Sequence, residues 1–369
     1  MPPSPAVAQR VVLRTAETLL IGAVGGTVFT LIGAPAGLVS GSLLSVAAAS
    51  LLGRPMMVPR PLSRVLSVLV GISLGAVVTP ETLQGLFAFP LSITIMLVST
   101  ACMMAATTSY LCFVHGWDAQ TALFGASPGA LAQVMTLAAE YGADLRKIAI
   151  VQVMRVVVLT IGIPTGLAYF GLMVEGRMMM RVGPPASVTE IVILVAASAG
   201  TALLANRLRF PGGLMFGAML GSAALHGSGY VHAILPWWVA AAAVVGIGSV
   251  TGSRFANTDP RTLLKYLGAA LGSFAVAITV ATLFAVLLTN VLSVRIPDTV
   301  VAFAPGAQDT MMVLALALHL DPIFVGAHHV SRFLLVSLSL PILAGRLQRK
   351  PPEKTAEQVQ PPVRPTIED

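Results

Sequence analysis

The chain of 369 residues is 56% hydrophobic and only 10% charged, and its mean hydropathy is +0.87. Because a soluble domain carries about a quarter charged residues, this composition excludes a soluble globular protein. The net charge of +7 comes from Lys and Arg in short connections and at the termini, which is typical of an oriented membrane protein rather than of a nucleic-acid-binding protein. We therefore predict an all-α integral membrane protein in a lipid bilayer, without a nucleic-acid partner.

Apolar runs with about the length of a bilayer-spanning helix recur along most of the chain. Before the last run of each half lies an apolar segment that a Pro-Gly-Ala tripeptide interrupts, at about 119–143 and 297–320. The polar, proline-rich end of the chain has no apolar face, so we expect disorder there. The uninterrupted candidate spans are 11–31, 35–53, 62–80, 89–114, 147–172, 188–206, 211–229, 234–252, 266–292 and 322–345.

The two halves of the sequence are copies of each other at an offset near 176 residues. PAGLVSG at 35–41 corresponds to PGGLMFG at 211–217, and VGI at 70–72 corresponds to VGI at 245–247. Chance similarity between two apolar stretches does not place proline, aspartate and arginine in register, so the pattern indicates a duplication. The matched single residues are Pro128-Gly129-Ala130 with Pro305-Gly306-Ala307, Asp144 with Asp321, Arg155 with Arg332, and Pro164 with Pro341.

The basic residues predict how the two copies are oriented. They cluster near the N-terminus and at 54–64, 207–209, 254–265 and 346–350. If all these clusters are cytoplasmic, an even number of crossings separates them, which requires each interrupted segment to enter and leave the membrane on the same side. Each half then has five transmembrane helices plus a re-entrant or broken helical hairpin, and the two halves are inverted repeats. In the alternative, each interrupted segment crosses fully as a discontinuous helix, which would place the 207–209 cluster outside.

This topology divides the chain into five parts. A cytoplasmic segment, 1–10, precedes the first membrane repeat, 11–172. A periplasmic linker, 173–187, leads to the second repeat, 188–345, and a disordered cytoplasmic tail, 346–369, ends the chain. Both termini are then cytoplasmic, and the first apolar run lacks the small-residue cleavage site of a removable signal peptide.

The interrupted segments predict a binding site at the two hairpin tips. Non-helical backbone survives at membrane depth only where protein or a water-filled cavity satisfies its polar groups. Two inverted hairpins that meet near the midplane form the site of a secondary transporter, and the half-helix N-terminus at each tip offers free N–H groups to an anion. A lone Pro-Gly is more often a helix kink, but two matched occurrences favour the site. We assign substrate binding to Ser127, Pro128, Gly129 and Ala130 at one tip and to Pro305, Gly306 and Ala307 at the other.

Two arginines extend this predicted site. Arg155 and Arg332 each lie about ten residues inside an apolar run, where a charge is costly and must face a cavity or a partner. Each arginine either contacts an anionic substrate directly or ties down hairpin carbonyls or a carboxylate. Gln152 and His329 stand one helical turn earlier on the same faces, so they join the substrate-binding set.

The second tip is more polar than the first, which indicates a coupling-ion site. Gln308, Asp309 and Thr310 follow the second tip, where the first half has Leu131, Ala132 and Gln133. Asp309 therefore has no charged counterpart, and it could pair with Arg332, bind Na⁺ together with backbone carbonyls, or carry a proton. We assign the coupling ion, Na⁺ or H⁺, to Asp309, Gln308, Thr310 and Gln133.

We expect no metal site and no other cofactor. His319, Asp321, His328 and His329 lack the spacing of a recognised ligand pattern. Cys102 and Cys112 fall in one apolar segment and are expected to be buried small hydrophobes rather than a disulfide or a metal pair.

The duplicated PAGL/PGGL motifs and the Pro-Gly-Ala…Met…Arg…Pro pattern resemble the AbrB-type membrane proteins, often labelled putative ammonia monooxygenase or membrane regulator. The resemblance covers about residues 15 to 345. It implies a multi-pass protein of the bacterial inner membrane with two copies of one module, similar by broader analogy to inverted-repeat carriers of 2-hydroxycarboxylates and bile acids. The chain shows no copper- or iron-ligand constellation for an oxygenase and no basic cytoplasmic domain for DNA binding.

We therefore predict a secondary transporter of a small, anionic solute that works by elevator-like alternating access, coupled to Na⁺ or H⁺. We expect a homodimer formed through the scaffold. The alternative is a membrane-embedded sensor or regulator of gene expression that has a transporter-like fold and binds without turnover. No enzyme is expected, because a membrane enzyme would need a metal or nucleophile constellation.

Overall fold

The computed structural model describes residues 5–77, 89–129, 131–172, 187–256 and 258–347, and every regular element in these ranges is helical. Most of the predicted linker and nearly all of the predicted tail lie outside the described residues, as does Ala130 at the first tip. Within the described ranges, seven helices are long and apolar enough to cross a membrane. They are α1 (Pro5–Leu31), α5 (Phe89–His115), α8 (Leu145–Tyr169), α9 (Val188–Arg207), α11 (Trp237–Gly252) with the 3-10 turn η2 (Ser253–Phe255), α12 (Pro260–Val291) and α15 (Pro322–Leu347).

Three of the other predicted spans form shorter helices, α2 (Gly37–Leu51), α3 (Arg60–Gly75) and α10 (Gly213–Gly227). With 15 or 16 residues each they are about 22–24 Å long, less than the roughly 30 Å of a hydrocarbon core. The matched PAGL and PGGL motifs explain the late start of α2 and α10. Ala36 and Gly212, the residues before these helices, take left-handed conformations with φ of 50° and 61°, so the first turn begins only after them.

Glycines in α3 and α11 let the two halves pack closely in a reciprocal way. A β-carbon at Gly75 would lie 2.4 Å from the Met219 carbonyl oxygen, and one at Gly252 would lie 2.5 Å from the Leu43 carbonyl oxygen. Since Met219 matches Leu43 at the offset of 176, the same contact occurs twice.

The glycine contacts also correct one sequence match. Gly71 lies against Met215 and Ala218. Gly248 lies against Val39 and Ser42, which match Met215 and Ala218 at the offset of 176, so Gly248 is the counterpart of Gly71. The predicted match of VGI at 70–72 with VGI at 245–247 is therefore out of register by two residues.

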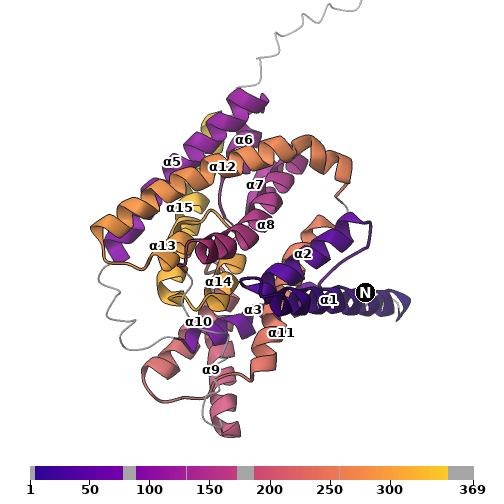
Figure 1. Ribbon diagram of the computed structural model, residues 1–369, viewed down its shortest axis with the longest axis vertical. Coiled ribbons are helices and arrows are strands. Elements are labelled where there is room, and N and C mark those ends of the chain that lie inside the picture. The colour runs from indigo at the N-terminus through magenta and orange to yellow at the C-terminus, as the bar shows by residue number, and fades with distance from the viewer. Residues whose placement is uncertain (1–4, 78–88, 130, 173–186, 257, 348–369) are drawn as a thin grey trace, which may run out of the picture.

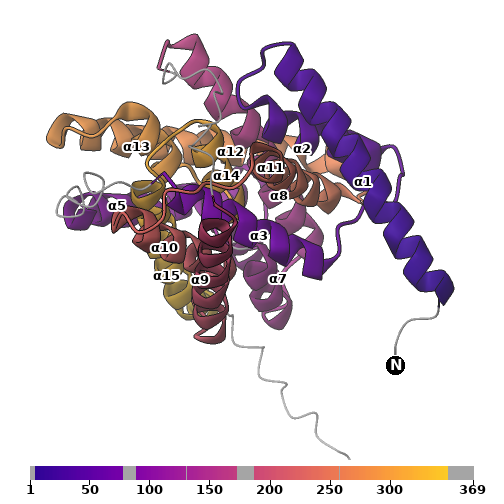
Figure 2. The same cartoon turned by 90° about the horizontal axis from the view of Figure 1, so that it is seen from below.

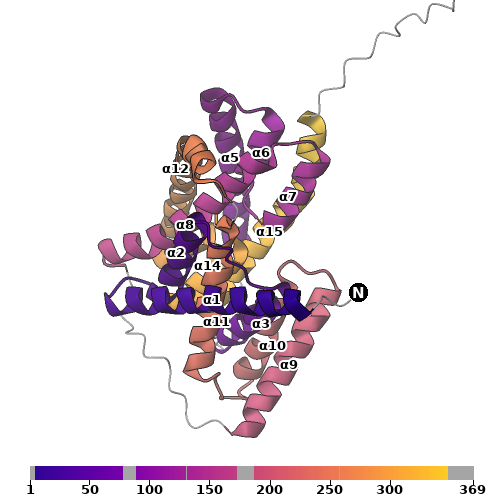
Figure 3. The same ribbon diagram turned by 90° about the vertical axis from the view of Figure 1, so that its right-hand side faces the viewer.

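The helices form two groups, each built from equivalent parts of both halves. The first contains α1–α3 and α9–α11, in which α3 packs on α10 as α11 packs on α2. The second contains α5–α8 and α12–α15, in which α5 crosses α12, and α15 packs on α5 as α8 packs on α12. Figures 1 and 3 show α5 and α12 on one side of the molecule and α1, α3 and α9–α11 on the other. We call these groups the scaffold bundle and the hairpin bundle.

The outer helices carry apolar side chains on their exposed faces. Figure 2 shows α1 along the outer edge of the molecule, and Val12, Leu13 and Leu20 on this helix are each more than 60% exposed. Such a surface fits contact with lipid. Cys102 on α5 is also exposed, so the prediction that it is buried is wrong, because it lies on the outer face of its helix.

Each interrupted segment folds into a helical hairpin. Its two ends lie together, because the Asp144 N–H donates to Thr121 Oγ1 over 2.9 Å and the Asp321 N–H donates to Asp298 Oδ1 over 2.7 Å. Neither segment therefore runs on in one direction as a discontinuous helix. The hairpin arms are α6 (Ala119–Ala126) with α7 (Leu131–Glu140), and α13 (Ile296–Phe303) with α14 (Gln308–Ala317).

Proline chemistry explains where each hairpin breaks. The residue before a proline is driven out of the helical region, and Ser127 and Ala304, which precede Pro128 and Pro305, have extended ψ angles of 123° and 131°. A proline has no N–H with which to continue the helix. The carbonyls at the ends of α6 and α13 are consequently left without their helical partners and must be satisfied by other groups.

The matched aspartates cap the helices that follow the hairpins. Asp144 accepts hydrogen bonds from the backbone N–H groups of Arg146 and Lys147 at the start of α8. Asp321 accepts from those of Ile323 and Phe324 at the start of α15. These caps fix the angle at which each hairpin joins the long helix that carries the buried arginine.

Candidate functional site

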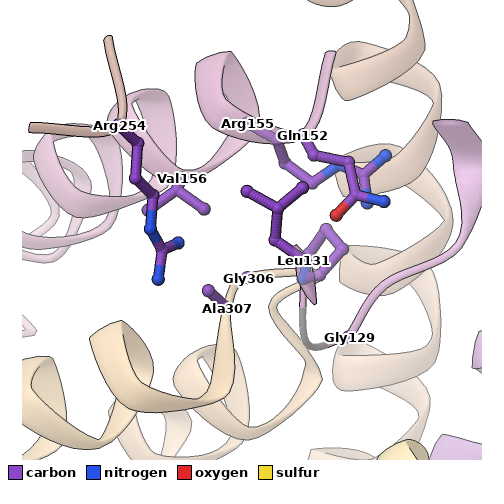
Figure 4. Close-up of a pocket in the computed structure, with 9 residues that line it drawn as sticks. Gly129, Leu131, Gln152, Arg155, Val156, Arg254, Gly306 and Ala307 are labelled. Atoms are coloured by element: carbon purple, nitrogen blue, oxygen red, sulfur yellow. The ribbon is translucent and has the colours of Figure 1, made fainter. Parts of the chain in front are cut away.

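The two hairpin tips meet at a pocket between the hairpin bundle and η2, the turn that follows α11 of the scaffold bundle (Figure 4). Its cavity volume is only about 10 Å³, room for about one water molecule, so in this conformation the lining residues nearly fill it. No carboxylate is among the described residues that line it. The lining residues are Gly129 and Leu131 from the first tip, Pro305, Gly306 and Ala307 from the second, Gln152, Arg155 and Val156 from α8, and Arg254 from η2.

Arg155 and Arg332 hold the broken ends of the hairpins. Arg332 donates from Nη1 to the Ala304 carbonyl and from Nη2 to the Ala302 carbonyl, over 2.5 and 2.6 Å. Arg155 donates from Nη2 to the Gly125 carbonyl over 2.6 Å and from Nη1 to the Ser127 carbonyl over 3.4 Å. Both side chains are buried. The arginines thus donate hydrogen bonds to carbonyls that lack their helical N–H partners because the prolines break the helices.

The residues one turn earlier act in the same way. Gln152 Nε2 donates to the Phe124 carbonyl over 3.0 Å, and His329 Nε2 lies 3.1 Å from the Val301 carbonyl in the other half. These contacts span 28 residues in both halves, so the duplication extends to individual hydrogen bonds. Of these four predicted site residues, Gln152 and Arg155 line the pocket, whereas His329 and Arg332 do not.

Arg254 is a pocket residue that the sequence analysis missed. It was counted with the cytoplasmic basic residues at 254–265, but its half-buried guanidinium extends into the pocket toward Ala307 (Figure 4). Within the described residues it has neither a hydrogen bond nor a direct ion pair. A sequence signal was available, because Arg254 has no basic counterpart in the first half, where Val77 occupies the equivalent position.

The residues assigned to the coupling ion do not all lie together. Thr310 Oγ1 lies 3.5 Å from Thr251 Oγ1 on α11, one turn before Arg254. Asp309, beside Thr310, is attracted electrostatically to Arg254 rather than to Arg332. Gln133 lies elsewhere, exchanging hydrogen bonds of 3.0 and 3.1 Å with Ser337 on α15.

Gln308 is buried, and its Nε2 has no partner in the structure. A β-carbon at Gly212 would lie 2.6 Å from this nitrogen, so the side chain points toward the PGGL turn of the scaffold bundle rather than toward Asp309. No group of three or more His, Cys, Asp or Glu in the described part of the chain is arranged to hold a metal ion.

The pocket suits an anion. Arg254 supplies an uncommitted positive charge, and the Nε of buried Arg155 has no hydrogen-bond partner. Ala307, which precedes α14, has no side-chain cap over the helix N-terminus, so the first N–H groups of α14 remain available. Positive charge and free donors without a lining carboxylate favour a small oxyanion.

Comparison with known proteins gives the family. A family model described as "Transition state regulatory protein AbrB" matches residues 38–348. The chain is 28% identical over 350 residues to the "Uncharacterized protein YhjN" of Bacillus subtilis, covering 88% of this chain and 90% of the relative. It is 27% identical over 336 residues to the "Putative regulator AbrB" of Escherichia coli, covering 87% of this chain and 93% of the relative. With this match over most of its length, and with the apolar helices described above, the chain belongs to the AbrB family as a membrane-type member.

Proposed function

We propose that this protein is a secondary transporter of a small anionic solute, coupled to Na⁺ or H⁺, in the bacterial inner membrane. The observation that carries the proposal is the pocket where the two hairpin tips meet, with Arg254 and Arg155 at its walls and an uncapped helix N-terminus beside it. A broken helix at membrane depth persists only where protein or a water-filled cavity satisfies its polar groups, and two inverted broken hairpins that meet are typical of a transporter site. The pocket has a cavity volume of only about 10 Å³ in this conformation, so a solute would enter only when the two bundles move apart.

We further propose that the halves are inverted repeats with both termini in the cytoplasm. The reciprocal packing of α3 on α10 and of α11 on α2 supports a two-fold relation between the halves. The positions of the basic clusters support an axis in the membrane plane, because five crossings per half place equivalent loops on opposite sides.

Alternating access would arise from movement of the hairpin bundle against the scaffold bundle. Few helices of one bundle pack against the other bundle. The contacts between the bundles involve mainly α14 and α8 of the hairpin bundle and α2, α3 and α11 of the scaffold bundle. Both hairpins belong to the same bundle, so the two tips would move together, whereas Arg254 on η2 would stay with α2 and α11 of the scaffold bundle.

A regulator is the second candidate, and the names of the family model and of the Escherichia coli relative favour it. A sensor would use the same pocket for binding but would not move its ligand across the membrane. The proposed homodimer would fit either function.

Uptake into proteoliposomes distinguishes the two candidates. Purified protein would be reconstituted and offered radiolabelled lactate, malate, citrate or phosphate, with and without an imposed Na⁺ or proton gradient. A transporter gives saturable, gradient-dependent uptake of at least one anion above protein-free liposomes. Binding of an anion to the purified protein without any uptake would reject transport and favour the regulator.

A further inference from the structure

The three buried or half-buried arginines around the tips are not equivalent. Arg155 and Arg332 donate two hydrogen bonds each to hairpin carbonyls and occupy matched positions in the two halves. Arg254 lies in the second half alone, extends into the pocket and has no direct partner among the described residues. The two clamping arginines are required for the hairpin ends whether or not a solute is present, whereas Arg254 is free to bind one.

Asp309, like Arg254, is a charged residue without a charged counterpart in the first half. Its counterpart in the first half is Ala132, so Arg254 and Asp309 are both additions of the second half. The contact of Thr251 with Thr310 joins the two chain segments that carry them, one turn before Arg254 and one residue after Asp309. The two charges attract each other but form no direct ion pair, which leaves Arg254 accessible to a ligand.

We propose that Arg254 binds the anionic group of the solute, and that Asp309 is the counter-ion of Arg254 in the empty site and the acceptor of the coupling cation in the loaded site. This inference rests on the proposed transport of a small anion and adds how the coupling works. In the empty site the charge of Asp309 balances that of Arg254. A bound monoanion takes over Arg254 and leaves Asp309 unbalanced in a half-buried setting within the hairpin bundle, where a lone charge is costly. Asp309 must then take up one proton or one Na⁺.

The other charged groups near α14 do not change this balance on binding. Arg155 and Arg332 keep their carbonyl partners, and both histidines of α15 are engaged through a ring nitrogen with a backbone carbonyl. The titratable or charged groups on the elements that pack against α14 are Arg60 and Arg64 on α3, Arg146, Lys147, Arg155 and Tyr169 on α8, Asp298 on α13, and His328, His329, Arg332 and Arg346 on α15.

The charge balance also predicts the class of solute. One uncommitted guanidinium matches one carboxylate or similar oxyanion through two parallel hydrogen bonds. A dianion or trianion would need a second cation as well engaged as Arg254, whereas both Nη atoms of Arg155, the other lining cation, are held by hairpin carbonyls. We infer a small monoanion carried together with one cation.

Binding measurements across pH and Na⁺ test the inference. Lactate, malate, citrate and phosphate would be titrated onto the purified wild type, Arg254→Gln, Asp309→Asn and the double variant, in sodium and in choline buffers. Arg261→Gln is the matched control, since Arg261 is exposed at the start of α12. In choline buffer, lactate should bind wild type more tightly as the pH falls, because protonated Asp309 releases Arg254. At high pH, added Na⁺ should tighten lactate binding instead, because Na⁺ then neutralises Asp309 in place of the proton.

The variants separate the two roles. Arg254→Gln should weaken lactate binding about tenfold or more, the equivalent of one lost charged hydrogen bond, whereas Arg261→Gln should not. Asp309→Asn should bind lactate independently of pH and Na⁺, and the double variant should bind weakly and without that dependence. Unchanged binding by Arg254→Gln, or retained ion dependence in Asp309→Asn, overturns the inference while leaving transport intact. If wild type binds and transports none of the four anions, the proposed function and this inference both fail.

Discussion

The clamping role of the two matched arginines predicts a specific difference in stability. Replacing Arg332 with methionine keeps an apolar stem of similar length but removes two short hydrogen bonds, to the carbonyls of Ala302 and Ala304. A hydrogen bond to a charged group contributes about 1.5–3 kcal/mol, so the gross loss is about 3–6 kcal/mol. Removing a charge from an apolar setting returns at least about 2.5 kcal/mol, which offsets much of this loss in the single variant.

Comparison with the equivalent change in the first half isolates the contribution of the hydrogen bonds. Arg155→Met relieves a similar buried charge but loses one short hydrogen bond and one long contact of 3.4 Å. Subtracting the two variants cancels the charge term and leaves about one charged hydrogen bond. The free energy of unfolding of Arg332→Met should therefore be about 1–3 kcal/mol lower than that of Arg155→Met.

Equilibrium unfolding in mixed micelles with increasing SDS measures this difference, followed by tryptophan fluorescence. Leu338→Met is the control on the same helix, because this side chain is 71% exposed on the outer face of α15. It should match wild type. Equal stability of the two arginine variants, or a less stable Arg155→Met, would refute the assignment of the arginines as clamps of unequal strength.

Two further predictions test the topology and the packing. A cysteine at Arg54 and one at Tyr230, exposed and equivalent in the two halves, should react with an impermeant thiol reagent from opposite sides of the membrane; reaction of both in intact cells would contradict inverted repeats. Gly75→Ala should destabilise the protein by about 1–3 kcal/mol, because its β-carbon would lie 2.4 Å from a carbonyl oxygen of α10. Gly166→Ala on α8, where nothing lies within 4 Å, should instead stabilise by up to about 1 kcal/mol in the same unfolding assay, and equal effects of both changes would argue against the close packing.

Much of the fold could be predicted because it follows from local chemistry. Pro128 and Pro305 interrupt apolar runs, and the structure breaks its helices at the residues before them. The matched Asp144 and Asp321 were visible as a repeat, and both cap the following helix. Features that depend on one residue and its immediate neighbours in the chain can therefore be predicted from the sequence.

The candidate site was less predictable because its contacts are long-range. The sequence left open whether Arg332 met a substrate, a carboxylate or hairpin carbonyls, and the carbonyls it binds lie 28 and 30 residues away. Arg254 was overlooked because a basic residue at the end of an apolar run is usually a topology signal. Its position in the pocket depends on how α11 packs against α14, which no local pattern records.

The central claim is that a small anion binds between the two hairpin tips, and a cysteine at Ala307 tests it most directly. Ala307 lines the pocket and precedes α14, and Cys102 and Cys112 would first be replaced by alanine. The rate of modification by a small methanethiosulfonate reagent would be measured in purified protein with increasing lactate, with a cysteine at Tyr230 as the control. We predict that lactate slows modification at Ala307 in a saturable way, at the concentration that half-saturates binding, and leaves Tyr230 unaffected. Bound lactate that leaves the rate at Ala307 unchanged would place the binding site elsewhere and contradict the account.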